Sequence, residues 1–139
     1  MKSTDDLKHE IICASDIVDF LDKNRDELQF GGLPERLKEW LEVKACKKSD
    51  VIRRSGLNRV YVYQIFSGLK RPSRDKLIAI AFGFSMTLEE SNRLLRQAGY
   101  AELYPRDIRD AIIIKSIDQR VSIIDCNELL YDHQIEVLE

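Results

Sequence analysis

The chain contains few of the residues on which metal binding, disulfide bonding and covalent catalysis depend. Its 139 residues include three cysteines and two histidines. No two cysteines form a C-x-x-C pair, and His9 and His133 are isolated, so the pattern predicts reduced thiols and no metal site. Nucleophile elbows, phosphate-binding loops and suitably placed pairs of carboxylates are also missing. The sequence therefore predicts a protein that is not an enzyme and that uses no cofactor.

Long apolar segments are missing too. No run of about 18 apolar residues is present, which argues against a membrane-spanning helix. The acidic N-terminus lacks the pattern of a secretory signal peptide, so we expect a cytoplasmic protein. No pattern typical of a small-molecule site is evident. The apolar fraction of 44% is ordinary and is enough for a hydrophobic core.

Helical patterns cover the chain, and no strand pattern or internal repeat is present. The predicted helices begin at or close to Ser3, Pro34, Lys48, Arg59, Ser73, Thr87, Ile108 and Ser122. Residues 22–32 are mostly polar and end in two glycines, and this composition predicts a connection between helices. We therefore expect an all-α protein.

Residues 48–72 are the most informative segment. Gly56 stands where the end of a first helix needs a residue in the left-handed conformation, which glycine adopts without steric cost. Asn58 is then placed to cap a second helix, from Arg59 to about Ser67, by accepting a hydrogen bond from a backbone N–H. Gly68 ends that helix. Two helices joined by a tight glycine-containing turn predict a helix-turn-helix motif.

The second helix of the motif has two different faces. Its apolar residues recur at the spacing of one helical face, and they are Tyr61, Val62, Ile65 and Phe66. The residues that fall mostly on the opposite face are Arg59, Val60, Tyr63, Gln64 and Ser67. Polar and aromatic side chains thus lie where such a helix would meet a DNA groove.

Positive charge is concentrated around these two helices. The whole chain carries 22 Lys and Arg against 24 Asp and Glu, a net charge of −2. Residues 44–76 contain ten Lys and Arg against two Asp, a net charge of +8, which leaves −10 for the other residues. A solvated helical face is the plain explanation of such a run. Its coincidence with the motif favours a surface that meets phosphate.

Several residues of this region occur at the spacing of a known family. They are Gly56-Leu57-Asn58, Val62, Ile65, Ser67-Gly68 and Lys70-Arg71-Pro72-Ser73. Through them, residues 33–98 resemble the lambda-repressor-like (XRE-type, phage-repressor class) helix-turn-helix domain. The resemblance implies a five-helix DNA-binding core at residues 33–99, with helical extensions at 1–32 and 100–139. In that family the second motif helix lies in the major groove, and the first crosses the DNA backbone.

The resemblance also implies base contacts. Arg59 is expected to read guanine, Val60 to meet a thymine methyl group and Gln64 to pair with adenine. Tyr63 lies beside Gln64 and is expected to reach the backbone or a base. A plainer role stays open for each residue, as a solvated side chain for Arg59 and Gln64 and as local packing for Val60 and Tyr63.

The other candidate residues are expected to contact the DNA backbone. Lys48 stands where the family often has glutamine, and a lysine there favours a phosphate contact. Ser67, Lys70 and Arg71 lie at the end of the second helix and in the loop that follows it. Asn58 is a further DNA-binding candidate, in addition to its capping role. Lys70 has the plainer alternative of a solvated side chain.

One departure from the family concerns a buried Arg–Glu pair that joins the first core helix to the recognition helix. Here the two positions are Leu41 and Phe66. Replacing a buried ion pair with apolar residues of suitable size is often neutral or stabilising. We therefore expect Phe66 to point inward and to contact Leu41 in the core.

The sequence thus predicts a sequence-specific double-stranded DNA-binding protein that regulates transcription. Because repressors of this type commonly bind two half-sites as dimers, a homodimer through the acidic helical extensions is expected. The alternative is a protein-interaction module on a repressor-like helical core without DNA readout, which the acidic flanks and the tyrosines of the second motif helix favour. An enzyme with an added DNA-binding head is a weak hypothesis, because too little chain remains for a catalytic domain.

Overall fold

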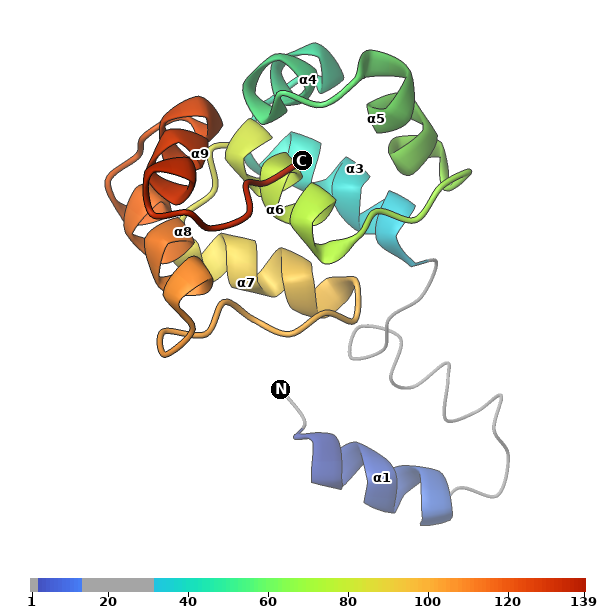
Figure 1. Ribbon diagram of the computed structural model, residues 1–139. Helices are drawn as coiled ribbons and strands as arrows, with labels where there is room; N and C mark the ends of the chain where they lie inside the picture. Colours follow the sequence, from blue (N-terminus) through green and yellow to red (C-terminus); the bar gives the residue numbers. More distant parts are fainter. Residues whose placement is uncertain (1–2, 14–31) are drawn as a thin grey trace. The chain divides into compact units, whose positions relative to one another are not determined.

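Helices are the only regular secondary structure in residues 3–13 and 32–139, which are the residues that the structure, a computed structural model, describes (Figure 1). They are α1 (Thr4–Cys13), α3 (Leu33–Val43), α4 (Lys48–Ser55), α5 (Arg59–Ser67), α6 (Arg74–Gly83), α7 (Leu88–Gln97), α8 (Ile108–Asp118) and α9 (Ile123–Asp132). No strand occurs among these residues, so the expected all-α class is confirmed. The connection predicted at 22–32 lies outside the described residues, apart from Gly32.

Capping hydrogen bonds explain why several helices begin where the sequence predicts. The side-chain oxygens of four residues each accept a hydrogen bond at 3.0–3.2 Å from the backbone N–H three residues on, and these residues are Ser3, Ser73, Thr87 and Ser122. Glu90 accepts in turn from the N–H of Thr87 at 2.9 Å, which completes the predicted capping box of α7.

The chain divides into two compact units, Met1–Gly32 with α1 and Leu33–Glu139 with the other helices. The C-terminal helices α8 and α9 belong to the same unit as α3 to α7. The predicted division between residues 99 and 100 therefore falls inside the larger unit. No helix in the part of the chain that the structure describes is both long and apolar enough to cross a membrane.

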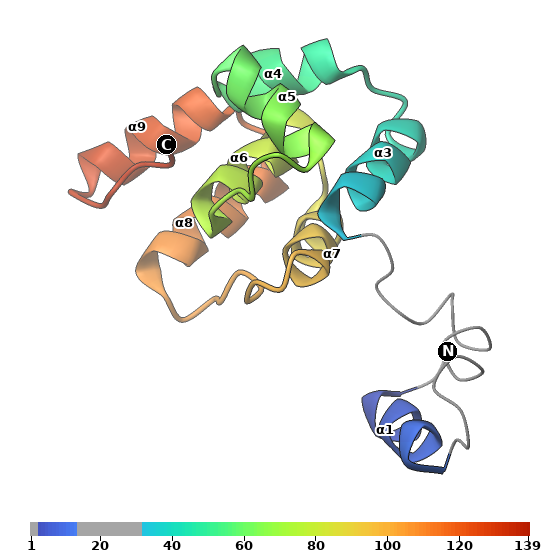
Figure 2. The ribbon, with the colours of Figure 1, turned by 90° about the vertical axis from the view of Figure 1, so that its right-hand side faces the viewer.

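Helix α6 lies in the middle of the larger unit, and α4 and α7 pack against it (Figures 1 and 2). Residues 77–81 of α6 are buried on every side of the helix, as expected for a central helix. At Gly83 an added Cβ would lie 2.6 Å from the carbonyl oxygen of Val51 in α4. A side chain at this position would therefore push α4, the first motif helix, away from the core.

Two ion pairs fasten α8 to α6, and we call their four residues, Arg74, Asp75, Arg109 and Asp110, the α6–α8 junction. Arg74 donates from both terminal nitrogens to the Asp110 carboxylate at 2.9 and 3.2 Å. Arg109 donates in the same bidentate way to Asp75 at 2.8 and 2.9 Å. Paired guanidinium and carboxylate groups of this geometry are among the stronger polar contacts in proteins.

Asp110 is the most buried carboxylate of the junction, with a side chain 9% exposed. Burial acts to raise its pKa, but the hydrogen bonds from Arg74 and from the backbone N–H of Tyr104 outweigh burial and hold the pKa below its ordinary value. Asp110 therefore remains charged at neutral pH and holds the linker after α7 as well as α6.

The C-terminal residues are also held by specific contacts. Arg109 donates to the carbonyl oxygens of Glu136 and Val137 at 2.9 and 3.1 Å. The side chain of Asn127 both accepts from the N–H of Leu138 and donates to its carbonyl oxygen. Leu138 is buried, so the last residues complete the core of the larger unit.

Candidate nucleic-acid interface

The turn between α4 and α5 has the geometry that its sequence predicts. Gly56 is in the left-handed conformation with φ of 71°. Asn58 is extended, and its side-chain oxygen accepts from the N–H of Tyr61 at 3.2 Å, which caps α5. The Ser55 hydroxyl accepts from the N–H of Leu57 at 3.2 Å. Gly68, with φ of 85°, ends α5 as predicted.

The inner face of α5 is packed into the core. Val62, Ile65 and Phe66 are at most 2% exposed. The Phe66 ring lies 6.3 Å from the ring of Phe84, centroid to centroid, at a tilt of 40°. The predicted inward direction of Phe66 is therefore confirmed. Leu41 is partly buried against the same core, and its contact with Phe66 stays a prediction.

The opposite side of α5 reaches solvent, and we call its residues, Arg59, Val60, Tyr63, Gln64 and Ser67, the outer face of α5. All are exposed except Gln64, which is half-buried. Val60 is 63% exposed and Tyr63 is 40% exposed, so the plainer expectation that they pack locally holds only in part. The Ser67 hydroxyl donates to the carbonyl oxygen of Gln64 at 3.1 Å.

Tyr63 joins the outer face of α5 to the first residue of α4. The Lys48 ammonium lies 5.8 Å from the centre of the Tyr63 ring, and the Arg59 guanidinium lies 5.7 Å from it. The Lys48 ammonium is also 5.5 Å from the Phe66 ring. Cations at these distances are attracted to the ring electrons. Lys48, Arg59 and Tyr63 therefore form one basic and aromatic cluster near the N-terminal end of α5.

A second basic and aromatic cluster surrounds Tyr61. The ammonium groups of Lys70 and Lys76 lie 5.9 and 5.4 Å from its ring centre. Burial raises the pKa of Tyr61, and the nearby Tyr100 raises it by a smaller amount. The Tyr61 phenol is therefore neutral at neutral pH. Lys76 belongs to this cluster although the motif assigned it no role. The one sequence feature that could have indicated Lys76 is its position in the basic segment, residues 44–76.

Arg71 has a partner inside the protein that its sequence position did not indicate. It donates to the carbonyl oxygen of Ala98 at 3.0 Å, and its guanidinium lies 5.4 Å from the Tyr100 ring. The Tyr100 hydroxyl donates to the carbonyl oxygen of Pro72 at 2.6 Å. Arg71 therefore links the loop after α5 to the end of α7, where a cation is favourable beside the last carbonyls of the helix.

The positive charge of this region is smaller at the surface than in the sequence. Three of the ten cations of residues 44–76 pair with carboxylates, Lys44 with Glu90, Arg53 with Asp50 and Arg74 with Asp110, at 2.9–3.2 Å. Within the described residues, the cations of this segment that form no ion pair are Lys47, Lys48, Arg54, Arg59, Lys70, Arg71 and Lys76. Most of these lie around the two clusters, which concentrates the uncompensated charge near α5.

The structure brings Lys48 next to Tyr63, 15 positions away in the sequence, whereas Arg71 contacts Ala98 and Tyr100 instead. Among residues 3–13 and 32–139, no group of three or more histidine, cysteine or acidic side chains is placed to hold a metal ion. No protein-family model, curated protein or solved structure matches the chain. The geometry and charge of the site therefore carry the functional argument.

Proposed function

We propose that this chain is a sequence-specific double-stranded DNA-binding protein that regulates transcription, with α5 in the major groove and α4 across the backbone. The observation that carries the proposal is the division of α5 into a buried face and an exposed face next to uncompensated cations. A recognition helix needs both faces, because the buried one fixes it on a rigid scaffold and the other must reach base edges.

The finer architecture belongs to the same proposal. Helices α3 to α7 serve as a five-helix, repressor-like core, and α8 and α9 extend it. The close approach of α4 to Gly83 and the burial of Phe66 support this assignment, because they hold both motif helices on α6 and its neighbours. A rigid mounting lets the exposed side chains keep one geometry relative to the groove.

Base readout is assigned to three residues of the outer face. Arg59 is suited to the two acceptors of guanine, and Gln64 is suited to the donor and acceptor of adenine. Val60 presents an exposed apolar surface that fits the methyl group of thymine. The Tyr63 ring lies near the cations of both Lys48 and Arg59, and its hydroxyl is suited to a phosphate or a base edge.

Backbone contacts are assigned to Lys48, Lys70 and Arg71, with Asn58 and Ser67 beside them. Lys70 stands next to Lys76 at the Tyr61 ring, so two cations are available beside the first turn of α5. For Arg71, binding phosphate requires it to exchange or share its contact with the Ala98 carbonyl. Lys70 is therefore the stronger phosphate candidate of the loop.

Fluorescence anisotropy with a labelled random-sequence duplex, measured over a series of salt concentrations, tests the proposal. Each phosphate that a protein neutralises contributes about −0.9 to the slope of log affinity against log salt, so three cations give a slope of roughly −3 per protomer. Absence of binding at low salt contradicts the proposal. Selection of bound duplexes from a random pool then identifies the site, and a palindromic site indicates a dimer.

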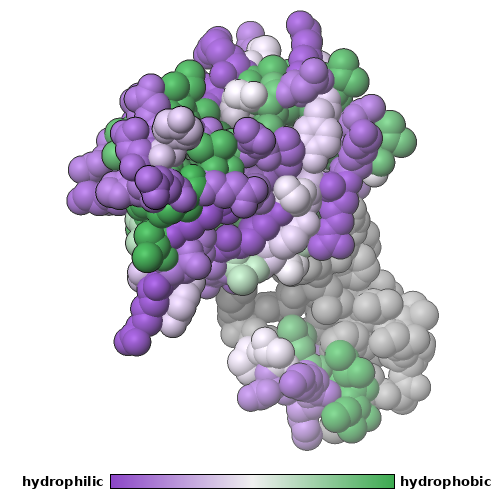
Figure 3. Space-filling model, viewed as in Figure 1, coloured by the Kyte–Doolittle hydropathy of each residue, from purple (hydrophilic) through white to green (hydrophobic). Residues whose placement is uncertain are grey.

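A protein-interaction module is the second candidate function. Val60, at the start of α5, and Leu69, just beyond its end, are 63% and 73% exposed, and exposed apolar side chains also suit a protein partner. Figure 3 shows hydrophobic groups at the α4–α5 end of a mostly hydrophilic face. The salt series separates the two functions, because a protein-interaction module without DNA readout shows no affinity for the random duplex.

We further propose that the protein forms a homodimer through its helical ends. Helix α9 exposes Ile124, Leu129 and Tyr131 beside several acidic residues, and this mixture suits a moderately polar interface. A dimer would place two copies of α5 on half-sites about 34–36 Å apart. Sedimentation equilibrium of the full chain measures the mass, and a monomer at all concentrations contradicts this arrangement.

A further inference from the structure

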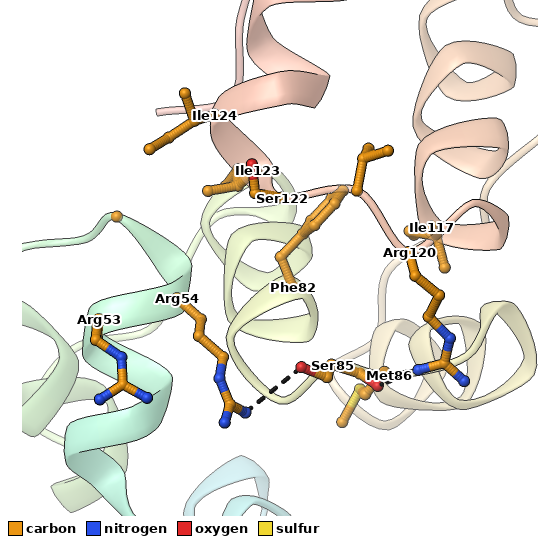
Figure 4. Close-up of a pocket in the computed structure, with 12 residues that line it drawn as sticks. Arg53, Arg54, Phe82, Ser85, Met86, Ile117, Arg120, Ser122, Ile123 and Ile124 are labelled. Atoms are coloured by element: carbon orange, nitrogen blue, oxygen red, sulfur yellow. Dashed lines mark hydrogen bonds between the residues drawn. The ribbon is translucent and has the colours of Figure 1, made fainter.

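A pocket of about 400 Å³ lies between α4, the end of α6, the end of α8 and the start of α9 (Figure 4). Its volume is within the range of small-molecule sites, which are about 300–1,000 Å³. Two of its arginines, Arg54 of α4 and Arg120 after α8, come from opposite sides in Figure 4 and extend toward Ser85 and Met86. No pattern in the sequence indicates this pocket, since Arg54 and Arg120 are 66 positions apart.

The pocket combines an apolar surface with an excess of positive charge. Phe82, Met86 and Ile117 line it together with the first residues of α9. Three arginines also line it, and no acidic residue does. Arg53 is offset by Asp50 at 3.2 Å, whereas Arg54 and Arg120 have no carboxylate partner in the described part of the chain.

The two uncompensated arginines are held loosely by the protein. Arg54 uses one terminal nitrogen, at 3.4 Å from the Ser85 hydroxyl and 3.5 Å from the Gly83 carbonyl oxygen. Arg120 also uses one terminal nitrogen, at 3.1 Å from the Ser85 carbonyl oxygen. These contacts place the two guanidinium groups on opposite sides of Ser85. Each guanidinium keeps N–H groups that can donate to a ligand.

The start of α9 lines the pocket too, on the side away from Ser85 and Met86 in Figure 4. Ile123 and Ile124 are the first residues of the helix, and the first N–H groups of a helix have no acceptor within it. Ser122 accepts from the N–H of Asp125 and so occupies only the third N–H. The pocket is therefore lined by two guanidinium groups, by the N-terminal end of α9 and by apolar side chains.

We propose that this pocket binds a small organic carboxylate with an apolar body. The carboxylate lies between Arg54 and Arg120, and the hydrocarbon body contacts Phe82, Met86 and Ile117. Charge complementarity favours an anion over a neutral or cationic compound, because two arginines without acidic partners face the pocket. The apolar lining favours a carboxylate with a hydrocarbon chain or ring over a small inorganic anion.

Octanoate is a suitable probe, and its binding is measured by titration of the ¹⁵N-labelled full chain in NMR. We expect saturable shifts at Ser85, Arg120 and Ile123. Acetate, which lacks the apolar body, and 1-octanol, which lacks the charge, bind at least about tenfold more weakly. The measurement uses no DNA, so its outcome is independent of the proposed function.

Two arginine variants test the charged end of the site. Arg54→Gln and Arg120→Gln are each expected to weaken octanoate binding about tenfold, since each removes a charge-assisted contact. Arg106→Gln changes the net charge equally outside the pocket and is expected to bind octanoate as the unmodified chain does. Circular dichroism checks that each variant is folded, and either arginine variant alone is sufficient if the other unfolds.

Three results overturn the proposal. If octanoate causes no saturable shifts in the protein spectrum, the pocket does not bind this class of ligand. Equal binding of octanoate and 1-octanol removes the role of the arginines. Equal weakening by Arg106→Gln and Arg54→Gln shows that only the overall charge of the protein attracts the probe.

Discussion

At the α6–α8 junction each arginine lies within 2.9 Å of a carboxylate, whereas Arg59 on the outer face of α5 and Lys48 beside it lie 5.7 and 5.8 Å from the centre of the Tyr63 ring. Arg74 and Arg59 belong to the same basic segment of the sequence. Arg74 links α6 to α8 through its ion pair with Asp110, and Arg59 is exposed to solvent. Charge in the sequence therefore does not tell which cations are available at the surface, because ion pairs in the fold neutralise some of them.

The same comparison separates stability from recognition. At the junction Asp110 is buried and the other three charged groups are half-buried, and each pairs with its partner, so the loss of one leaves the other unpaired. Arg59, the charged residue of the outer face of α5, is exposed to solvent, so its loss is expected to cost little stability and to change only the proposed DNA binding. Changes in the two regions are expected to affect different measurements.

The largest expected effect comes from Asp110→Asn at the junction. The amide keeps the shape of the side chain but leaves the charge of Arg74 without its partner, and we expect a loss of about 3 kcal/mol in the free energy of unfolding. Urea unfolding followed by circular dichroism measures it. A change below about 1 kcal/mol would mean that the Arg74–Asp110 pair does not fasten α8 to α6.

The dependence of the unfolding free energy on pH provides a control for the Asp110→Asn variant. The pKa of Asp110 is lower in the folded protein than its ordinary value of about 4, so the stabilisation is complete above that pH and is lost as the pH falls through the folded pKa. Asparagine does not titrate. The unfolding free energy of Asp110→Asn is therefore expected to fall less steeply below pH 4 than that of the unmodified chain.

The next effect is expected on the outer face of α5. Gln64→Ala removes the proposed pair with adenine and should cost about 2 kcal/mol in binding to the selected DNA site, with relaxed preference at one base pair. Stability should change little, since alanine is a strong helix former and Gln64 is not part of the core. Competition anisotropy with single-base variants of the site measures both the loss of affinity and the preference at each base pair. An unchanged preference at every position would remove Gln64 from the base-reading residues.

Lys70→Ala tests the other half of the surface and should have a smaller effect. The loss of one phosphate contact weakens all duplex sequences alike and reduces the salt slope by about 0.9. Lys115→Ala in α8 removes an exposed lysine away from α5 and should leave the slope unchanged. A loss for one sequence only would show that Lys70 contacts a base.

The helices and the motif were predictable because their causes are local. Gly56, Asn58 and Thr87 act through their own backbone and the next few residues, so their sequence pattern is enough to place the turn and the caps. The inward direction of Phe66 followed from helical periodicity. The DNA role of the outer face rests on residue types, and it stays a proposal that binding experiments must test.

The unpredicted features depend on pairs that are distant in the sequence. Arg74 and Asp110 are 36 positions apart, and Arg71 meets the carbonyl of Ala98 across 27 positions. Neither pattern nor local charge indicates such partners, so the basic segment looked more uniform in sequence than it is in the fold. The pocket between Arg54 and Arg120 was not predictable for the same reason, because it joins residues that are 66 positions apart.

The smallest expected effect comes from Glu102→Gln, the matched change at an exposed ion pair. Glu102 accepts from Arg96 at 2.7 Å, a distance as short as those of the junction, but the two side chains are 45% and 55% exposed. Water already solvates both charges, so we expect a loss below about 0.5 kcal/mol in the same urea measurement. Because Glu102→Gln and Asp110→Asn both replace a carboxylate with its amide, their ratio isolates burial from hydrogen-bond length. Equal losses would show that distance, and not burial, decides how strongly an ion pair holds this fold.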